Sequence, residues 1–477
     1  MLTFRIVMRR LGLACLALLS LAACLYAQDA ASGANERLDR QFQAAVAQYE
    51  SGRFAEAATA LEALLRDVPE SFEVHELLGL VYSAQSQDAK ATMHLEKAVH
   101  LKPDSASARM NLAINLAQLG KLQPAEAEFK KALALEPKNY DANHNLGELY
   151  VRAGQVPAAV PYLEQAQRIK PAAYDNGYDL ALAYIVTTRL ADARQLLQGL
   201  LKLKDSAEMH NLLGEVEEKD GKFVAAANEY ELAAHLDPSE SNLFDWGSEL
   251  LLHRTLEPAI QVFQSATERY PNSPRLAIGL GIAYYSRGNY DDAVKSLLRA
   301  ADLSPGDPRV YPFLSRAYDS SPSQAEEVIA RFRRFAEQQP GNARAQYYYA
   351  MSLWKGKRAQ DPHLDLTEVG ALLKKSIALD PALDEAHLQL GNLYSEQSKY
   401  ADSIPEYQRA LELNSDLADA HYRLGQAYVH TGDKDKAQQQ LQVYQKLREQ
   451  HLADLDRQRA EVRQFVYAAK DASATKP

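Results

Sequence analysis

Cysteine is almost absent from this chain of 477 residues. Its two cysteines, Cys15 and Cys24, both lie close to the N-terminus. The rest of the sequence therefore has no thiol for a disulfide, a thiolate metal site or a cysteine nucleophile. This scarcity excludes a disulfide-stapled fold and cysteine-dependent catalysis for everything that follows Cys24.

A surplus of basic residues is missing as well. The chain has 53 Lys and Arg against 63 Asp and Glu, which gives a formal net charge of -10. Proteins that bind phosphate backbones gather basic residues on one surface. No block of Lys and Arg persists beyond the N-terminal segment. We therefore expect no nucleic-acid partner.

Long apolar runs are limited to one, near the N-terminus. Arg5, Arg9 and Arg10 precede the apolar run from Leu11 to Ala23. This run is shorter than the roughly 20 residues that a membrane-spanning helix needs. A basic start followed by a short apolar run is typical of a signal for export. We predict that residues 1–27 form such a signal and that the protein is exported and periplasmic.

Two cleavage sites compete within this signal. Residues 21–24, Leu-Ala-Ala-Cys, resemble the lipobox of bacterial lipoproteins, which would leave an acylated Cys24 as a membrane tether. Cleavage after Ala27 would instead make Cys24 an ordinary residue of the signal and release a soluble chain that begins at Gln28. The sequence leaves both alternatives open, and Cys24 is the lipidation candidate.

Motifs that carry catalysis or bind metals are not found. There is no Gly-rich phosphate loop and no GxSxG elbow, and residues 75–79, HELLG, fail the HExxH zinc pattern. Four histidines share one register of the repeat described below, without a recurring acidic or histidine partner beside them: His75, His210, His387 and His421. We interpret them as helix-packing residues. We expect no enzyme, with no catalytic residue, no metal site and no cofactor.

What the sequence does contain is proline at regular intervals. Nine of its 20 prolines are separated by 34, 34, 34, 67, 33, 34, 35 and 41 residues, and the step of 67 is two periods with one proline missing. These nine are Pro69, Pro103, Pro137, Pro171, Pro238, Pro271, Pro305, Pro340 and Pro381. A fixed period of this length predicts a stack of similar units in which each unit contacts only its neighbours.

Each period divides into two amphipathic helical halves that are separated by a polar turn, and proline ends the second half. Residues 274–307 show the pattern, with a turn at residues 287–289 before Pro305. Small residues return in register, as alanine 12 and 5 residues before the proline. They also stand 24 residues before it, at Gly79, Ala113, Gly147, Gly214, Gly247 and Gly281. We expect these positions to let two helices approach closely.

This pattern resembles the tetratricopeptide repeat (TPR), over residues 38 to about 447 and about twelve units. The resemblance implies an all-α fold, a right-handed α-solenoid of TPR helix-turn-helix units. Departures from the pattern are local, and two of them are that the unit at 174–204 has Thr187 and Thr188 where a glycine turn is usual, and that residues 354–366 hold an insert. We predict a tether at 28–37, the superhelix at 38–447, a C-terminal capping helix at 448–470 and a frayed tail at 471–477.

The resemblance also implies where a partner binds, because the first helices of TPR units line the concave side. The carboxylate clamp of TPR cochaperones is not supported, since only Asn392 with Arg423 nearby matches its pattern. The candidates on this face are apolar and aromatic: Tyr178, Leu182, Phe244, Ile278, Ile282, Tyr285, Tyr347, Trp354 and Tyr422. Such side chains are good anchors for a peptide or helix, and they equally pack between helices.

The sequence thus favours a non-enzymatic scaffold that binds a protein or peptide in its concave groove in the bacterial cell envelope. The layout looks like that of TPR lipoproteins of Gram-negative envelopes. Two alternatives stay open. One is a polysaccharide-binding accessory factor for polymer export, in which Tyr and Trp stack on sugar rings, and the other is a regulatory adaptor of an envelope hydrolase.

Overall fold

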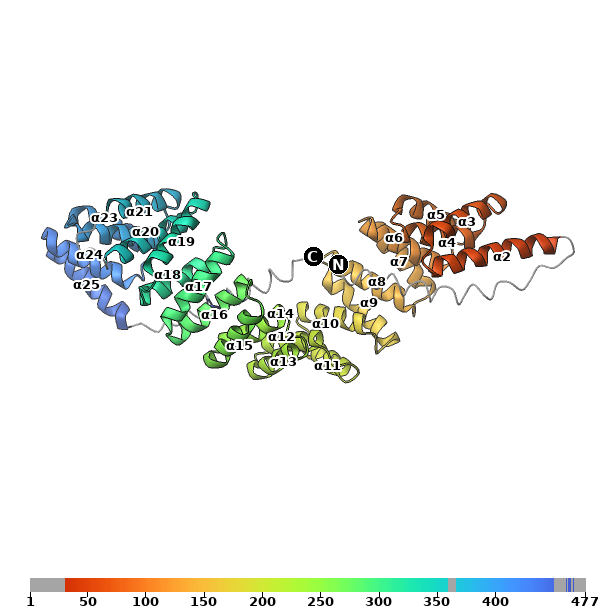
Figure 1. The fold of residues 1–477 in the computed structure, drawn as a ribbon, viewed down its shortest axis with the longest axis horizontal. Helices are drawn as coiled ribbons and strands as arrows, with labels where there is room; N and C mark the ends of the chain where they lie inside the picture. The colour runs from red at the N-terminus through yellow and green to blue at the C-terminus, as the bar shows by residue number, and fades with distance from the viewer. Residues whose placement is uncertain (1–30, 359–365, 450–459, 461, 465, 467–477) are drawn as a thin grey trace. The chain divides into compact units, whose positions relative to one another are not determined.

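The computed structural model describes residues 31–358, 366–449, 460, 462–464 and 466. Over these residues the chain contains helices and no strand, and Figure 1 labels them α2 to α25. They fall into two compact units, which meet in sequence between Gly221 and Lys222 and are described separately below. The export signal with Cys24, the core of the insert and the frayed tail lie outside the described residues.

Unit 1 holds five consecutive helix pairs and one further first helix. Its helices are α2 (Ala31–Glu50), α3 (Phe54–Asp67), α4 (Phe72–Ala84), α5 (Asp88–Leu101), α6 (Ala106–Gln118), α7 (Leu122–Leu135), α8 (Tyr140–Arg152), α9 (Val156–Ile169), α10 (Tyr174–Val186), α11 (Leu190–Leu201) and α12 (Ala207–Lys219).

Unit 2 begins with a second helix and continues with six pairs. Its helices are α13 (Phe223–Leu236), α14 (Glu240–Leu252), α15 (Leu256–Arg269), α16 (Pro274–Arg287), α17 (Tyr290–Leu303), α18 (Val310–Ser320), α19 (Ala325–Gln338), α20 (Ala343–Arg358), α21 (Thr367–Leu379), α22 (Asp384–Glu396), α23 (Tyr400–Leu413), α24 (Ala418–Thr431) and α25 (Lys434–Glu449).

The helices of each unit stack in serial order. Each first helix packs against its own second helix, as α16 does against α17, and first helices of adjacent pairs also touch, as α14, α16 and α18 do. Figure 1 shows this order as neighbouring hairpins that lie side by side along each unit. The predicted all-α solenoid of consecutive helix pairs is confirmed.

Local chemistry starts and stops the helices on this schedule. Several first helices begin at a Ser or Asn placed one or two residues after the periodic proline, and its side chain accepts a hydrogen bond from the backbone N–H three residues on, as Ser105 and Asn139 do. The turn inside a pair needs a residue at positive φ, and Gly154 and Gly288 supply it. Thr188 takes the same conformation at φ 59° in a pair that lacks this glycine, and Ser86 and Arg254 do so in two others.

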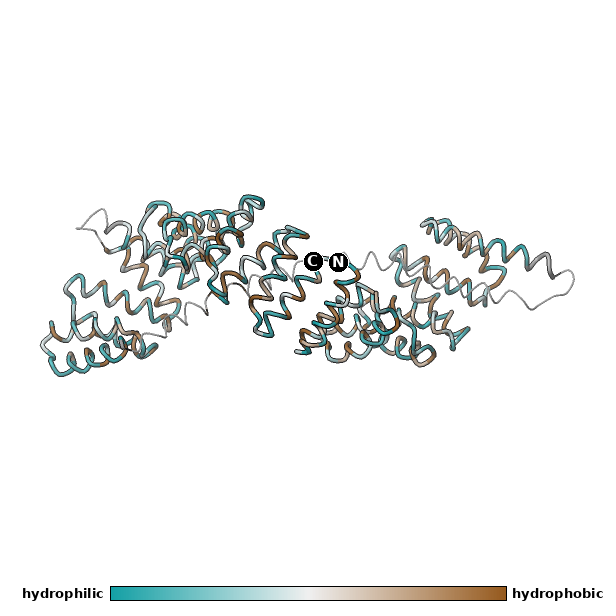
Figure 2. Tube along the Cα trace, turned by 90° about the horizontal axis from the view of Figure 1, so that it is seen from below, coloured by the Kyte–Doolittle hydropathy of each residue, from teal (hydrophilic) through white to brown (hydrophobic). Residues whose placement is uncertain are grey.

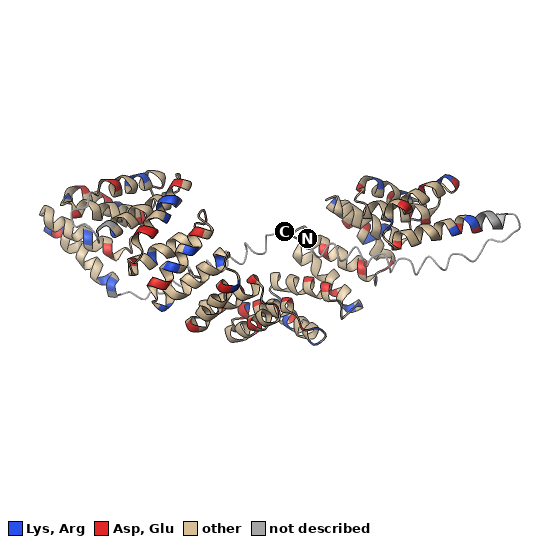
Figure 3. Ribbon diagram, viewed as in Figure 1, with Lys and Arg blue, Asp and Glu red and all other residues tan. Residues whose placement is uncertain are grey.

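The core of each unit lies between the helices. Fully buried leucine, alanine and aromatic side chains form continuous clusters within unit 1 and within unit 2. Apolar and polar residues alternate along the helices, as the brown and teal segments of Figure 2 show. Acidic and basic residues are interspersed over both units (Figure 3). Among the described residues no helix combines the length and the apolar character that crossing a membrane requires.

Two parts of the predicted division into segments differ from the structure. Helix α2 begins at Ala31, so residues 31–37 are helical and do not form a tether. Ala, Glu and Arg in this stretch favour a helix, and it continues into the packed part of α2. The described residues of the predicted capping helix do not cover the last pair either. Val466 is buried in the large cluster of unit 2, and Val462 lines a cavity with residues of α14, α16 and α18.

Candidate functional site

One cavity of unit 2 lies on the face formed by its first helices. It has a volume of about 720 Å³, and we call it the α20–α24 groove. Its lining comes mainly from α18, α20, α22 and α24: Asp319, Met351, Trp354, Lys355, Gln389, Asn392, Ser395, Glu396, Tyr400, Tyr422, Arg423, Gln426, Ala427 and His430.

Helical spacing brings these side chains to one face. Met351 and Lys355 are four residues apart on α20, Asn392 and Glu396 are four apart on α22, and Tyr422 and Gln426 are four apart on α24. Residues at this spacing lie above one another on a helix surface. Three successive helices therefore present three parallel rows of mostly polar side chains to the groove.

Trp354 is the buried aromatic residue of the groove. Its side chain belongs to the large cluster of unit 2 and the residue is 7% exposed. Its indole Nε1 has no hydrogen-bond partner among the described residues. A buried donor without a partner costs about 1–3 kcal/mol. Because the Nε1 atom itself is buried, an acceptor atom of a bound molecule removes this cost only when the indole turns toward the groove.

Asn392 is held in place by a residue that does not line the groove. Tyr407, which is fully buried, donates from its hydroxyl to Oδ1 of Asn392 at 2.9 Å. The same hydroxyl lies 3.0 Å from Oγ of Ser395. Asn392 Nδ2 donates to Oε1 of Gln389 at 3.1 Å. Because its acceptor is engaged by Tyr407, the amide of Asn392 is fixed with its N–H₂ group toward the groove residue Gln389.

Charges of both signs line the groove. Lys355 donates to the backbone oxygen of Asp319 and lies 3.2 Å from its Oδ1. Burial raises the pKa of Asp319, and Lys355 opposes this rise. Arg423 reaches Asp419 at 3.3 Å and is half exposed, so this ion pair is weak. The groove therefore offers hydrogen bonds and local charges of both signs rather than one strong charge.

Three of the predicted partner-binding residues are core residues. Phe244, Ile278 and Ile282 are fully buried in the large cluster of unit 2, so the prediction that they face a partner is wrong. They point between helices because α14 and α16 pack against their own second helices and against each other. This packing leaves little of the surface of α14 and α16 free for a ligand.

The other candidates divide among several places. Trp354 and Tyr422 come together in the α20–α24 groove, where Tyr422 is 37% exposed and packs on Tyr444. Tyr285 lines a different cavity, which is described next. Tyr178 and Leu182 are half-buried in unit 1 and pack against its cluster. Tyr347 packs edge-on against Tyr348, and burial strongly raises its pKa.

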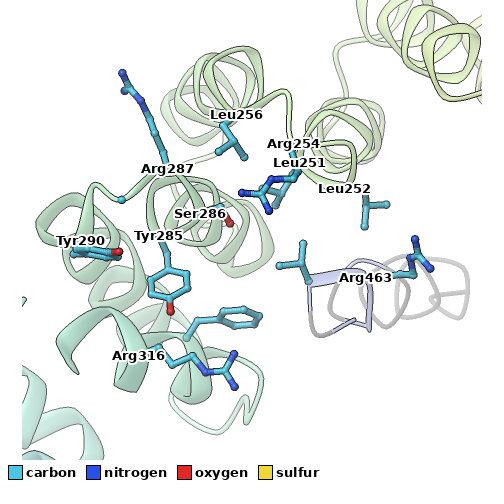
Figure 4. Close-up of a pocket in the computed structure, with 13 residues that line it drawn as sticks. Leu251, Leu252, Arg254, Leu256, Tyr285, Ser286, Arg287, Tyr290, Arg316 and Arg463 are labelled. Carbon is cyan, nitrogen blue, oxygen red and sulfur yellow. The ribbon is translucent and has the colours of Figure 1, made fainter. Parts of the chain in front are cut away.

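The second cavity lies on the first-helix face of α14, α16 and α18, and we call it the α14–α18 groove (Figure 4). It has a volume of about 300 Å³. Its lining residues are Leu251, Leu252, Arg254, Leu256, Tyr285, Ser286, Arg287, Gly288, Tyr290, Phe313, Arg316, Val462 and Arg463. The last two come from the C-terminal segment, which therefore already occupies part of this face.

The histidine register has a structural use. Three of its members contact the backbone carbonyl six residues before them through Nε2: His75 at Pro69, His387 at Pro381 and His421 at Ser415. Their Nδ1 atoms contact a side chain 19 residues on, at His94, Glu406 and Gln440. The helix-packing interpretation is confirmed for these three. The described residues contain no group of three or more His, Cys, Asp or Glu placed to hold a metal ion.

Sequence reasoning missed most of the polar lining. Gln389 and Gln426 carried no motif, and Asn392 was noted only as a partial match to the carboxylate clamp, although all three stand on the first helices at three- or four-residue spacing from predicted or other lining residues. That spacing on consecutive first helices is the signal that could have found them. The contact between Tyr407 and Asn392 joins two helices and has no such signal.

Family models match much of the chain. A model described as tetratricopeptide repeat matches residues 42–106, 110–174 and 244–308, and two others with this description match residues 152–216 and 419–451. A model described as TPR repeat matches residues 391–432. Together these matches cover more than half of the chain.

Curated relatives match part of the chain. Anaphase-promoting complex subunit 3 of Schizosaccharomyces pombe is 26% identical over 196 residues, which are 41% of this chain and 28% of that protein. Protein O-mannosyl-transferase TMTC3 of Mus musculus is 24% identical over 198 residues, 39% of this chain and 20% of that protein. The chain thus spans less than a third of the length of either relative.

Solved structures also match parts of the chain, with low TM-scores. YrrB, described as a TPR protein with an unusual peptide-binding site, is 18% identical with a TM-score of 0.37, and the match covers 39% of this chain and 96% of that one. PilF of Pseudomonas aeruginosa is 21% identical with a TM-score of 0.35, over 42% of this chain and 93% of that one.

Proposed function

The chain belongs to the tetratricopeptide repeat family, and from this premise we propose that it is a non-enzymatic scaffold that binds an extended segment of a partner protein in the α20–α24 groove. Repeat proteins of this kind offer long open surfaces, which suit an extended ligand better than a closed reaction pocket does. The groove's volume of about 720 Å³ is in the range of ligand-binding clefts.

The N–H of buried Trp354, which has no hydrogen-bond partner in the part of the chain that the structure describes, carries this proposal. An extended peptide exposes one N–H and one C=O per residue, so it can offer an acceptor to this donor. The side-chain amides of Gln389, Asn392 and Gln426 carry both donors and acceptors and match the same backbone groups. Tyr422, the exposed aromatic residue of the groove, can anchor an apolar side chain of the segment.

Mannosyl transfer is not part of the proposal. The O-mannosyl-transferase relative shares 198 residues with this chain, which are 20% of its own length. The match runs through repeated helical units of the kind that serve as scaffolds in many proteins. The proposed activity is therefore binding alone.

Site-specific crosslinking tests the groove. In cells that produce the full chain, the photoreactive residue p-benzoylphenylalanine replaces Tyr422. In a control chain, the same photoreactive residue replaces Leu379. Leu379 is similarly exposed, at 41%, but lies on the second helix α21. We expect a discrete crosslinked protein from position 422 and none from position 379.

A second variant ties the crosslink to the indole N–H. Trp354→Phe keeps an aromatic ring in the cluster and removes the donor, so we expect the crosslink from position 422 to weaken about fivefold. Equal crosslinking from both positions, or no effect of Trp354→Phe, would contradict the proposal. Retention of the chain on polysaccharide beads, without a protein crosslink, would favour the polymer-binding alternative.

We further propose that the scaffold acts outside the cytoplasm of a bacterial cell. The basic start and the short apolar run at residues 5–23 support export, and the residues around Cys24 support a lipid anchor. Mass spectrometry of the N-terminal peptide of the purified protein tests both statements. An acylated Cys24 supports the anchor, a chain that begins at Gln28 supports export without it, and an uncleaved N-terminus overturns both.

A further inference from the structure

The C-terminal segment lies on the first-helix face of unit 2, although α25 and residues outside the described range separate it from that face in sequence. Ala460, Val462–Gln464 and Val466 are helical. Val466 is fully buried in the large cluster of unit 2 and Val462 packs against that cluster. Val462 and Val466 are four residues apart, which places them on one side of a helix.

The surface that receives these valines is apolar in its centre. Leu252 of α14, Tyr285 of α16 and Phe313 of α18 line the α14–α18 groove together with Val462. Figure 4 shows the ribbon that carries Arg463 beside Leu252 and across the cavity from Tyr285. An apolar side of a helix laid on side chains from three neighbouring helices is how amphipathic helices bind in grooves.

The rim of this groove is basic, and so is the residue that the tail brings to it. Arg254, Arg287, Arg316 and Arg463 all line the cavity. Arg287 pairs with Glu257 at 2.5 Å. Arg254 and Arg463 have no ion pair with any described residue. The C-terminal segment therefore adds a positive charge to a rim where Arg254 has no counter-ion among the described residues, and like charges repel.

We propose that the C-terminal segment, through Val462–Gln464 and Val466, is a built-in, displaceable occupant of the α14–α18 groove, and that the partner which displaces it is an amphipathic helix with an acidic polar side. The valines hold the tail in place through apolar contact, while Arg463 makes it a poor match for the rim. A helix with Asp or Glu at the place of Arg463 pairs with Arg254 and binds the same apolar floor. This inference rests on the proposed scaffold function and adds a second, regulated binding surface to it.

Peptide binding to the full chain tests the proposal. The probe is a fluorescein-labelled synthetic peptide of residues 451–470, used together with the same peptide carrying Arg463→Glu. The variant with Val462→Asp and Val466→Asp should free the C-terminal segment from the groove, and we call it the released chain. Its matched control is Gln464→Asp, at an exposed position on the same segment. Fluorescence anisotropy measures binding, and circular dichroism checks that all chains remain helical.

We expect the released chain to bind the native peptide at least about tenfold more tightly than the wild-type and Gln464→Asp chains do, because burial of two valines no longer competes in cis. We expect the Arg463→Glu peptide to bind the released chain about fivefold more tightly than the native peptide at low salt, with the difference reduced at 0.5 M salt.

Two results would overturn the proposal. Equal binding of the native peptide by released and wild-type chains would show that the tail does not occupy the groove. If the Arg463→Glu peptide binds no more tightly than the native peptide, the inference that the partner is acidic is wrong. If the double-aspartate chain and the wild type melt differently, Arg254→Glu in the wild-type background gives a second measurement, since it should weaken binding of the Arg463→Glu peptide relative to that of the native peptide. None of these outcomes bears on crosslinking in the α20–α24 groove.

Discussion

Gly281 on α16 faces Leu297 on α17 so closely that a Cβ atom on the glycine would lie 2.5 Å from Cγ of the leucine. Leu297 is fully buried, so it has little room to move. The same relationship joins Gly79 to Leu95 and Gly147 to Leu163 in unit 1. The small residue that stands 24 positions before the periodic proline is therefore a contact surface for the large residue eight positions before it.

This contact predicts that Gly281→Ala destabilises the protein. The added methyl group must displace Leu297 or separate the two helices, and such overpacking costs about 1–3 kcal/mol, which outweighs the roughly 1 kcal/mol that alanine contributes to helix propensity. Urea unfolding of the full chain, followed by circular dichroism, measures the difference.

Gly306→Ala is the matched control for Gly281→Ala. A Cβ at Gly306 would meet no atom within 4 Å, and the residue lies in a turn of the same repeat. We expect its unfolding midpoint to stay close to that of the wild type. A Gly281→Ala chain as stable as this control would show that the helices separate without cost.

The fold could be predicted from the sequence because its determinants are local and repeated. The proline, the small residue at Gly281 and the turn at Gly288 each act within one helix pair, and repetition makes them visible. The partner-facing side chains could not be predicted as well. Phe244 and Ile278 have the right periodicity for the first-helix face, but the period does not say which stripe is covered by adjacent helices.

The C-terminal segment illustrates the same limit. Its apolar residues, Val462 among them, show that one side of the helix packs on something. They do not specify what it packs on, because the last helix pair and the α14–α18 groove both offer apolar surface. Val462 lines one cavity together with Tyr285 and Phe313, which are more than 140 positions away in sequence, and no local pattern encodes such an arrangement.

Thr188 predicts a stabilising substitution. It holds φ at 59°, a conformation that costs a β-branched residue about 1–2 kcal/mol and that glycine adopts freely. Thr188→Gly loses some of this gain because glycine is more flexible in the unfolded chain. We expect a net increase in unfolding free energy of about 0.5–1 kcal/mol, measured by urea unfolding.

The neighbouring Thr187 supplies the control for Thr188→Gly. Its φ is -87°, and its hydroxyl donates to the carbonyl of Ala183 at 2.7 Å. Thr187→Gly removes this bond and gains nothing from relief of strain, so we expect it to lower stability. Equal effects at both positions would mean that the positive φ of Thr188 carries no cost.

The buried pair His75 and His94 predicts a dependence of stability on pH. Their Nδ1 atoms are 3.0 Å apart, and His75 Nε2 lies 3.1 Å from the carbonyl of Pro69. Since a carbonyl only accepts, His75 carries its proton on Nε2 and His94 donates from Nδ1. Burial, with His75 as a second cause, lowers the pKa of His94 from 6.5 to about 4.

The unfolded chain therefore takes up a proton on His94 near pH 6.5, while the folded chain resists it until about pH 4. The free energy of unfolding should fall as the pH drops through this window, by on the order of 2–3 kcal/mol. His94→Gln should reduce the difference in stability between pH 7.5 and pH 5, measured by urea unfolding. His100→Gln, at an exposed position of the same helix, should leave it unchanged. The same slope in both variants would contradict the assignment.

Tyr407 is the residue whose effect on binding separates positioning from folding. Its hydroxyl fixes Asn392 and touches Ser395, yet the ring lies wholly between helices, where it also fills the space beside Gly391. Tyr407→Phe keeps the ring and removes the hydroxyl. We expect unfolding free energy to fall by about 1 kcal/mol, because Asn392 and Ser395 can turn to water in the groove.

Binding should respond more than stability does. Without the hydroxyl the amide of Asn392 is free to rotate, so the crosslink from position 422 should weaken about threefold to tenfold. Tyr428→Phe is the control: its hydroxyl accepts from Gln408 at 3.0 Å, and Gln408 lies on the second helix α23 and does not line the groove. It should lose similar stability and keep the crosslink. If both variants weaken the crosslink equally, Tyr407 acts through the fold, and Asn392 has no special part in binding.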